Sequence, residues 1–278
     1  MWNPRADISR PRYLNDAVDE FPQTLENALR KEVMHLYENA VELILHGLNL
    51  HRHEVYASEN IVETVNRSRS RFDLNIDAGY EQRVKTLYSA IVEFASRAGS
   101  KRMPDEIANR IYELRDVASG IVQAVKSVKH VRKNMLRYTT RPQGAVTELY
   151  DGLRCEFARV VVQLRKLEQA EAGERSALWL DHELVQIEDE ARSSSRRVDA
   201  MIRERRLEPS AATSFLNDSG YAYGAMRRLI EAARAYYIEA DAGVAEVEKL
   251  LSLDEEEILA AAGARTAGAE GGRHGHDT

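Results

Sequence analysis

Apolar residues recur along most of this chain at steps that alternate between three and four residues. A period near 3.5 residues lines up one apolar stripe along a helix, and neighbouring helices must cover that stripe at shallow crossing angles. Runs of this kind begin at Val146, Leu180 and Ala222. A further run after Pro104 contains Ile107, Ile111, Leu114, Ala118, Ile121, Val125 and Val128. The spacing therefore predicts a bundle of long, packed helices.

Proline positions indicate where these helices begin. Pro104, Pro142 and Pro209 each follow a polar stretch and precede a long proline-free run. Proline fits the first turn of a helix, because its missing N–H would be unpaired there anyway. Thr24 is a suitable N-cap for the first helix. We predict six helices, near residues 24–53, 77–98, 104–138, 143–170, 175–206 and 209–252. Residues 52–75 are ambiguous, and strand-like alternation is absent.

The six predicted helices divide into three and three. We therefore expect an all-α fold of two antiparallel three-helix bundles side by side, one over residues 23–140 and one over 141–260. Residues 1–22 are expected to form a linker-like segment. The tail over 261–278 is rich in alanine and glycine, and we expect it to be disordered.

Composition narrows the classes of function. Lys and Arg number 39 against 45 Asp and Glu, and the net charge of −6 argues against a nucleic-acid partner for the whole chain. Cys155 is the only cysteine. It lies within a helical pattern without a nearby histidine, which favours a small buried or half-buried thiol over a nucleophile. No stretch approaches the roughly 20 apolar residues of a membrane span, and the N-terminus lacks the apolar core of a signal peptide.

A basic stretch is the most distinctive local feature. No Asp or Glu occurs between Val117 and Thr147. Steps of three, four and four residues place four cations on one helix face: Lys126, Lys129, Lys133 and Arg137. This face suits docking to an anionic membrane leaflet, an acidic partner or phosphate. The alternative is a solvated helix end whose cations complement the helix dipole.

For the other candidate sites, ordinary surface residues are the more typical interpretation. His46, His51, His53 and Glu54 lie close together in sequence, but zinc needs three or four converging ligands. The five-residue step from His46 to His51 separates those two side chains around a helix, which favours a chance surface cluster.

Acid–base chemistry is the functional interpretation of Glu38 and Glu42, which lie one turn apart. A solvated helix face is the more typical setting for such residues. His274 and His276 belong to the predicted tail and suggest weak, adventitious metal binding at most. We assign no catalytic residue, no cofactor-binding residue and no metal ligand.

The opening segment carries a family resemblance. Residues 8–15 contain Pro11-Arg12-Tyr13-Leu14, which resembles the junction after the membrane part of bacterial sodium/phosphate cotransporters. A prolyl-arginyl-tyrosyl-leucyl stretch there leads into the cytoplasmic PhoU-like domain. Residues 125–138 and 213–221 are similar to the end of the third helix and the start of the sixth helix in that family.

The resemblance implies two three-helix bundles and a role in regulating phosphate uptake. It also implies a position on the cytoplasmic side, peripheral to the inner membrane, beside a transporter membrane domain. Two departures are visible. The chain lacks the transmembrane part, and only Asp73 to Asp77 matches the Glu/Asp-x-x-x-Asp metal motif. Lysines occupy the expected place of that motif on the third helix, so we expect no cofactor and no tightly bound multinuclear metal cluster.

Three functional interpretations follow. The first is a non-enzymatic regulatory module that docks to a sodium/phosphate transporter. The second is a free-standing PhoU-type adaptor that links phosphate uptake to a signalling kinase. The third is a metal-dependent enzyme or metal-storage bundle. Pro11 to Leu14 favours the first, and the scarcity of carboxylate pairs and Glu-x-x-His spacing speaks against the third. The oligomeric state stays open, a homo-oligomer included.

Overall fold

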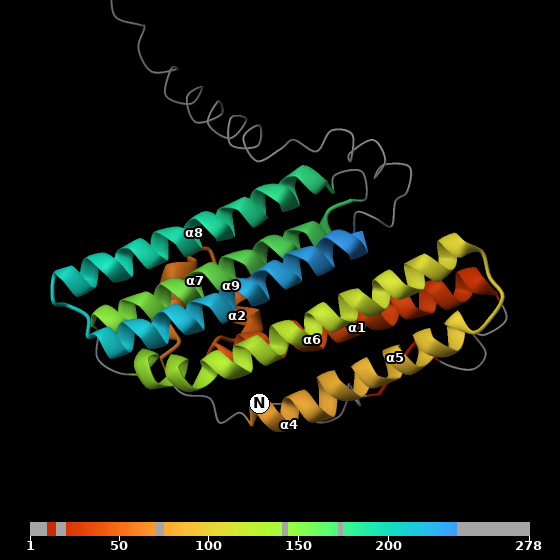
Figure 1. The fold of residues 1–278 in the computed structure, drawn as a ribbon, viewed down its shortest axis with the longest axis horizontal. Helices are drawn as coiled ribbons and strands as arrows, with labels where there is room; N and C mark the ends of the chain where they lie inside the picture. The colour runs from red at the N-terminus through yellow and green to blue at the C-terminus, as the bar shows by residue number, and fades with distance from the viewer. Residues whose placement is uncertain (1–9, 15–20, 70–74, 141–143, 172–174, 238–278) are drawn as a thin grey trace, which may run out of the picture.

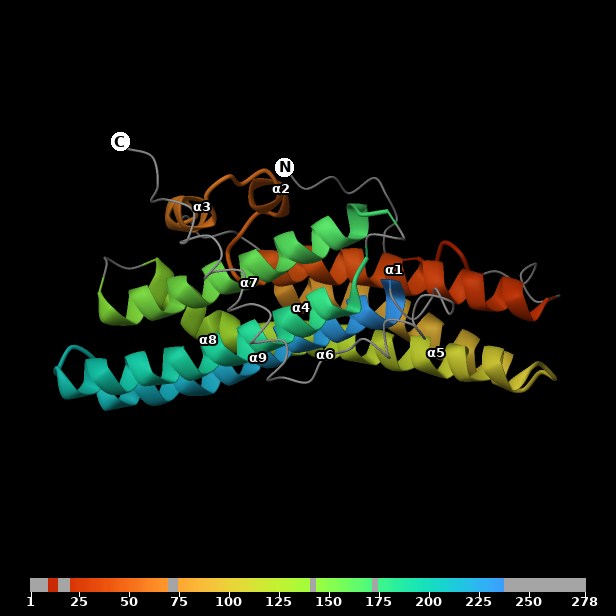
Figure 2. The same cartoon turned by 90° about the horizontal axis from the view of Figure 1, so that it is seen from above.

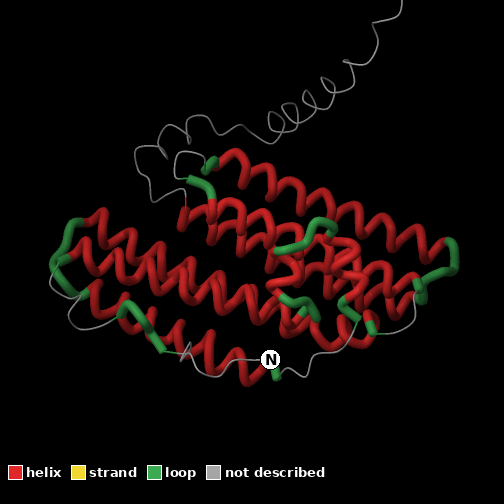
Figure 3. Tube along the Cα trace, turned by 180° about the vertical axis from the view of Figure 1, so that it is seen from behind, coloured by secondary structure: helices red, strands yellow, loops and turns green. Residues whose placement is uncertain are grey.

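The described part of the chain is helical. The computed structural model describes residues 10–14, 21–69, 75–140, 144–171 and 175–237. Helices and connecting loops make up these residues, and no strand occurs among them (Figure 3). The predicted all-α class is therefore confirmed for this part of the chain.

The helices follow one another with short connections (Figure 1). They are α1 (Pro22–Gly47), α2 (Arg52–Tyr56), α3 (Ile61–Arg67), α4 (Ile76–Gly79), the π-helical segment η2 (Tyr80–Lys85), α5 (Thr86–Gly99), α6 (Asp105–Thr139), α7 (Ala145–Gln169), α8 (Ala177–Arg203) and α9 (Pro209–Tyr237). The helix predicted over 77–98 corresponds to the continuous run from α4 to α5. The part predicted over 238–252 lies outside the described residues, as does the predicted tail.

The long helix α6 lies at the centre of the packing. It contacts α1, α5 and α7, and it packs along α9. Helix α9 in turn contacts α7 and α8. Figure 2 shows the short helices α2 and α3 beside α7. One hydrophobic cluster contains residues from all the long helices, so the core continues across the contact between α6 and α9.

The predicted apolar stripe on α6 is the buried face of that helix. Ile111, Ala118, Ile121, Val125 and Val128 are each at most 1% exposed. Because these positions alternate between steps of three and four, they face α1 on one flank and α9 on the other. The heptad interpretation is thus confirmed where it was made most strongly.

One predicted helix start needs correction, and proline explains the difference. Helix α1 begins at Pro22 with Phe21 as its N-cap, two residues before the predicted cap at Thr24. Proline in the first turn explains the earlier start, because its fixed φ already suits the helix. Pro209 begins α9 and Pro104 caps α6, as expected. Pro142 lies outside the described residues.

Helix α1 also ends earlier than the predicted residue 53. It stops at Gly47, and Asn49 has a φ of 59°. A Cβ atom on Gly47 would lie 2.8 Å from a methyl carbon of Val128, so only glycine allows this close approach of α1 to α6. The ambiguous region that follows, predicted only as 52–75, contains the two short helices α2 and α3.

A buried arginine holds this α2–α3 lobe, residues 48–69, against α7. Arg154 is fully buried. Its Nε donates to the carbonyl of Leu48 at 2.9 Å, and its two terminal nitrogens donate to the carbonyls of Asn49, Val65 and Ser68 at 2.9, 3.3 and 2.7 Å. Asp151 lies 3.0 Å from the same guanidinium. Carbonyl groups at the ends of α1 and α3 thereby receive side-chain donors.

Candidate functional site

The C-terminal half of α6 exposes a row of cations. Lys126, His130, Lys133 and Arg137 are exposed and follow one another at steps of four, three and four. This spacing keeps them on a narrow strip of the helix surface, opposite the buried Val128 and its core neighbours. We call these four residues the cationic stripe. Within the described part of the chain, no ion pair involves Lys126, Lys133 or Arg137.

Lys129 differs from the three other predicted cations. Its Nζ lies 2.7 Å from Oδ1 of Asp77, and its side chain is 24% exposed. The same nitrogen lies 4.4 Å from the centre of the Tyr80 ring, a favourable cation–π contact. Asp77 therefore compensates the charge of Lys129 at the edge of the stripe. The structure brings Lys126, Lys133 and Arg137 together as exposed, uncompensated charges.

Helix α9 flanks the stripe with exposed apolar residues. The ring of Tyr221 lies 4.1 Å from that of His130, centre to centre, and Nδ2 of Asn217 lies 3.5 Å from Nε2 of His130. Tyr221 is 41% exposed, and Leu216 beside Asn217 is 39% exposed. Sequence reasoning missed both residues. The available signal was their place outside the apolar repeat of α9, which begins at Ala222.

A buried polar cluster positions α6 and α9 beneath this surface. Asp218 is 2% exposed, and its Oδ2 accepts hydrogen bonds from Tyr150 Oη at 2.7 Å and from Asn134 Nδ2 at 2.9 Å. The three residues come from α9, α7 and α6, respectively. Burial and the bond to Asp218 raise the pKa of the Tyr150 hydroxyl well above its usual range, so Tyr150 stays a donor. The cluster fixes the two helices that carry the stripe and Leu216.

The histidines at the end of α1 come closer than sequence spacing indicated. Since α1 ends at Gly47, the rings of His46 and His51 lie 5.7 Å apart, and those of His51 and His53 lie 5.4 Å apart. The described residues nevertheless contain no group of three or more His, Cys, Asp or Glu side chains that could hold a metal ion. Burial lowers the pKa of His46, which favours the neutral ring.

The residues considered for nucleophilic or acid–base chemistry are Cys155, Glu38 and Glu42, and each has its own surroundings. Cys155 is half-buried, and burial raises the pKa of its thiol to about 11. A thiol that stays protonated at neutral pH is a poor nucleophile. Glu42 pairs with Arg52 at 3.4 Å, while Glu38 is exposed. Asp73, His274 and His276 lie outside the described residues.

The N-terminal segment that carries the family resemblance is bound to α1. Glu32 is fully buried, and its Oε2 accepts hydrogen bonds from the backbone N–H groups of Arg12 and Tyr13, both at 2.8 Å. Its other oxygen lies 2.8 Å from Nδ1 of His35. Burial raises the pKa of Glu32, but the hydrogen bonds from His35, Tyr13 and Arg12 outweigh burial and lower the pKa overall. Glu32 thus anchors this segment as a carboxylate.

Glu32→Gln is expected to loosen the segment. The amide side chain removes the charge and leaves a single acceptor oxygen, so the bonds from Arg12 and Tyr13 lose their charge assistance and the contact to His35 loses its acceptor. Hydrogen exchange followed by mass spectrometry should show at least about tenfold faster exchange of the residue 10–14 amides, which corresponds to about 1.4 kcal/mol. Glu38→Gln, an exposed change on the same helix, is the control. Equal exchange in the two variants would contradict the anchoring role.

The same contact has a predictable pH dependence. Because the folded-state pKa of Glu32 lies below its ordinary value of 4.5, the anchor contributes fully above that value. Its contribution is lost as the pH falls through the lowered folded-state pKa. Protection of the residue 10–14 amides should therefore be constant from neutral pH down to about 5 and decline below about 4, after correction for the intrinsic exchange rates.

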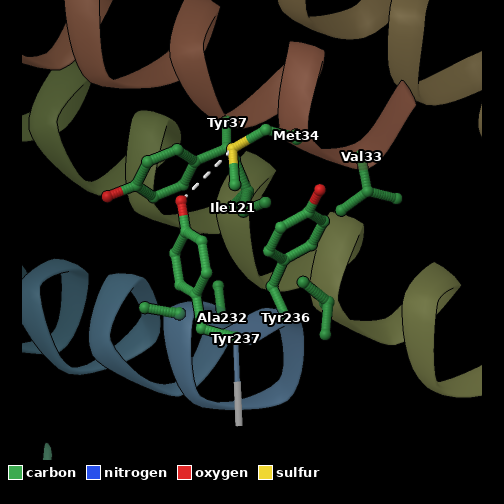
Figure 4. A pocket seen from close by; sticks show the side chains of 9 residues that line it. Val33, Met34, Tyr37, Ile121, Ala232, Tyr236 and Tyr237 are labelled. Carbon is green, nitrogen blue, oxygen red and sulfur yellow. Dashed lines mark hydrogen bonds between the residues drawn. The ribbon is translucent and has the colours of Figure 1, made fainter. Parts of the chain in front are cut away.

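A small apolar pocket lies where α1, α6 and α9 meet (Figure 4). Met34 and Tyr37 from α1 face Tyr236 and Tyr237 from α9, and Tyr237 Oη donates to Met34 Sδ at 3.8 Å. The cavity has a volume of only about 10 Å³, room for about one water molecule. Pockets that bind small molecules usually measure about 300–1,000 Å³. We therefore interpret this space as a packing gap.

Comparisons with known proteins identify no relative: no protein-family model, curated protein or solved structure matches the chain. Among the described residues, no helix is both long and apolar enough to cross a membrane. The candidate functional site is therefore defined by its own geometry, as the exposed surface of α6 and α9.

Proposed function

We propose that the protein is a non-enzymatic regulatory module that docks to the cytoplasmic side of a sodium/phosphate transporter and adjusts its flux. Its two halves, residues 23–140 and 141–260, act in this proposal as two three-helix units. The cationic stripe is the docking face, and the membrane domain of the transporter, in its anionic bilayer, is the partner.

The observation that carries the proposal is the uncompensated charge of the stripe. Lys126, Lys133 and Arg137 are exposed and unpaired among the described residues, on a chain whose net charge is −6. An acidic protein would be repelled by an anionic surface unless it presented a local cationic face toward it. A solvated helix end remains the alternative for these cations, and the experiment below separates the two.

The resemblance supplies the identity of the partner. Pro11 to Leu14, the stretch that resembles the cotransporter junction, lies against α1 rather than away from it, with two of its amides held by Glu32. When a membrane partner moves this segment, its fixed attachment to α1 transmits the movement to the helical bundle. The high pKa of the Cys155 thiol and the pairing of Glu42 with Arg52 favour regulation over catalysis.

The test is phosphate uptake by proteoliposomes that contain the membrane domain of a bacterial sodium/phosphate cotransporter in phosphatidylcholine with about 30% phosphatidylserine, which supplies an anionic leaflet. Adding the full chain to the cytoplasmic side is expected to change the sodium-dependent uptake rate at least twofold. The triple change Lys126→Gln, Lys133→Gln, Arg137→Gln should abolish that effect, and raising the salt concentration should weaken it. An uptake rate that is the same with and without the chain refutes the proposal.

A further inference from the structure

The cationic stripe is only half of an exposed surface whose other half lies on α9. Six large hydrophobic side chains are notably exposed among the described residues, and two of them, Leu216 and Tyr221, lie on this stretch of α9. The contact between Tyr221 and His130 places Tyr221 directly beside the stripe. Leu216, five residues earlier, lies about 140° around α9, at the other edge of its exposed face. Asp218, the carboxylate of this stretch, is buried under Tyr150 and Asn134 and contributes no acidic surface.

This combination of side chains matches the boundary between lipid headgroups and acyl chains. Lysine and arginine are attracted to anionic headgroups, tyrosine favours the interfacial region, and leucine contributes apolar area that can enter it. The stripe from Lys126 to Arg137 covers twelve residues, or eleven helical steps, and is therefore about 16 Å long. A row of this length can touch several headgroups at once.

We propose that the surface formed by Lys126, His130, Lys133, Arg137, Leu216 and Tyr221 binds an anionic lipid bilayer, with the side chains of Leu216 and Tyr221 entering the interfacial region. The inference rests on the docking function proposed above and specifies what the stripe touches. The bilayer holds the module beside its transporter. Contact with the transporter itself therefore supplies only part of the binding free energy.

A lipid surface fits these residues better than an acidic protein does. Lysine is depleted from the buried centres of protein interfaces, yet two of the three uncompensated cations are Lys126 and Lys133. These side chains are exposed on α6, and no carboxylate of the described residues pairs with them. A fluid layer of headgroups rearranges around flexible cations, whereas a protein partner needs them in defined positions.

The test is sedimentation of the full chain with vesicles of phosphatidylcholine containing about 30% phosphatidylserine. Each surface cation near such a membrane raises binding about fivefold. The triple change Lys126→Gln, Lys133→Gln, Arg137→Gln should therefore weaken binding about 100-fold. The double change Leu216→Ser, Tyr221→Ser should weaken it about tenfold with little change in salt dependence, because it removes apolar area and no charge.

Matched controls lie elsewhere on the molecule. Arg97→Gln, Lys101→Gln, Arg102→Gln removes the same charge at the junction of α5 and α6, far along α6 from the stripe. Val62→Ser, Tyr112→Ser removes two similarly exposed apolar side chains, 57% and 43% exposed. Both controls should keep binding within about twofold to fivefold of the unmodified chain. Circular dichroism confirms that each variant is folded before its binding is compared.

Three results would overturn the inference. They are binding to phosphatidylserine vesicles no stronger than to pure phosphatidylcholine, equal losses in the stripe variant and its charge control, and an unchanged affinity after the Leu216 and Tyr221 changes. Stripe-dependent binding to transporter in phosphatidylcholine, without binding to phosphatidylserine vesicles, would assign the surface to an acidic protein instead. Vesicle binding without any change in phosphate uptake would support the lipid surface while refuting the transport function.

Discussion

Replacing Arg154 by methionine is expected to lower the free energy of unfolding by about 3–5 kcal/mol. Methionine keeps the length of the stem but removes every donor. The carbonyls of Leu48, Asn49 and Ser68 would then lose these donors, with Ser68 keeping only the bond from Asn49 Nδ2, and Asp151 would lose one of its two arginines. Each orphaned buried group costs about 1–3 kcal/mol, although partial opening of the α2–α3 lobe would let water reach some of them.

Urea denaturation monitored by circular dichroism measures this loss. Arg154→Lys should recover only part of the stability, because a single ammonium cannot reproduce the planar fork that reaches both ends of the lobe. Arg203→Met, an exposed change on α8, is the control and should stay within about 0.5 kcal/mol. If Arg154→Met were as mild as the control, the hydrogen bonds of Arg154 would not be what holds the lobe.

Asp218→Ala is expected to cost about 2–4 kcal/mol, because the change leaves Tyr150 Oη and Asn134 Nδ2 buried without an acceptor. Asp218→Asn should cost less, since an amide oxygen in the place of Oδ2 can still accept both bonds, although without the charge. The neighbouring exposed change Asn217→Ala serves as the control. Thermal and urea unfolding of the three variants would show this order.

A double-mutant cycle separates the contribution of each contact. Tyr150→Phe removes the hydroxyl that Asp218 accepts from, so the cost of combining it with Asp218→Ala should fall short of the sum by about 1–2 kcal/mol. Strict additivity would show that Tyr150 and Asp218 stabilise the fold independently. The same variants test whether a fixed α6–α9 contact is needed beneath the cationic stripe.

The long helices were predictable because their signal is local. Alternating steps of three and four residues identified the buried stripe of α6, and Pro104 and Pro209 marked helix starts to within a residue. The end of α1 was not predictable in this way. It depends on Gly47 against Val128 and on Arg154, which lies far along the chain. Contacts of that kind do not affect the spacing of apolar residues within α1.

The candidate site was predictable only in part, for the same physical reason. Helical spacing grouped the cations of α6, and the absence of acidic residues in the stretch indicated an uncompensated charge. Spacing within one helix does not reveal that Asp77 meets Lys129, nor that Tyr221 of α9 lies against His130. Both contacts join segments distant in sequence, so they follow from the packing of helices rather than from any one of them.

The placement of Arg154 also determines how the chain tolerates changes in length. One guanidinium binds carbonyls on both sides of the α2–α3 lobe, at Leu48 and Asn49 and at Val65 and Ser68. It closes a loop without a covalent bond, a task that disulfides perform in chains with paired cysteines. Residues added near Ser58 would enlarge the closed loop at a cost that grows only with the logarithm of its length. The length of the α2–α3 lobe can therefore change while the helices that it packs against keep their positions.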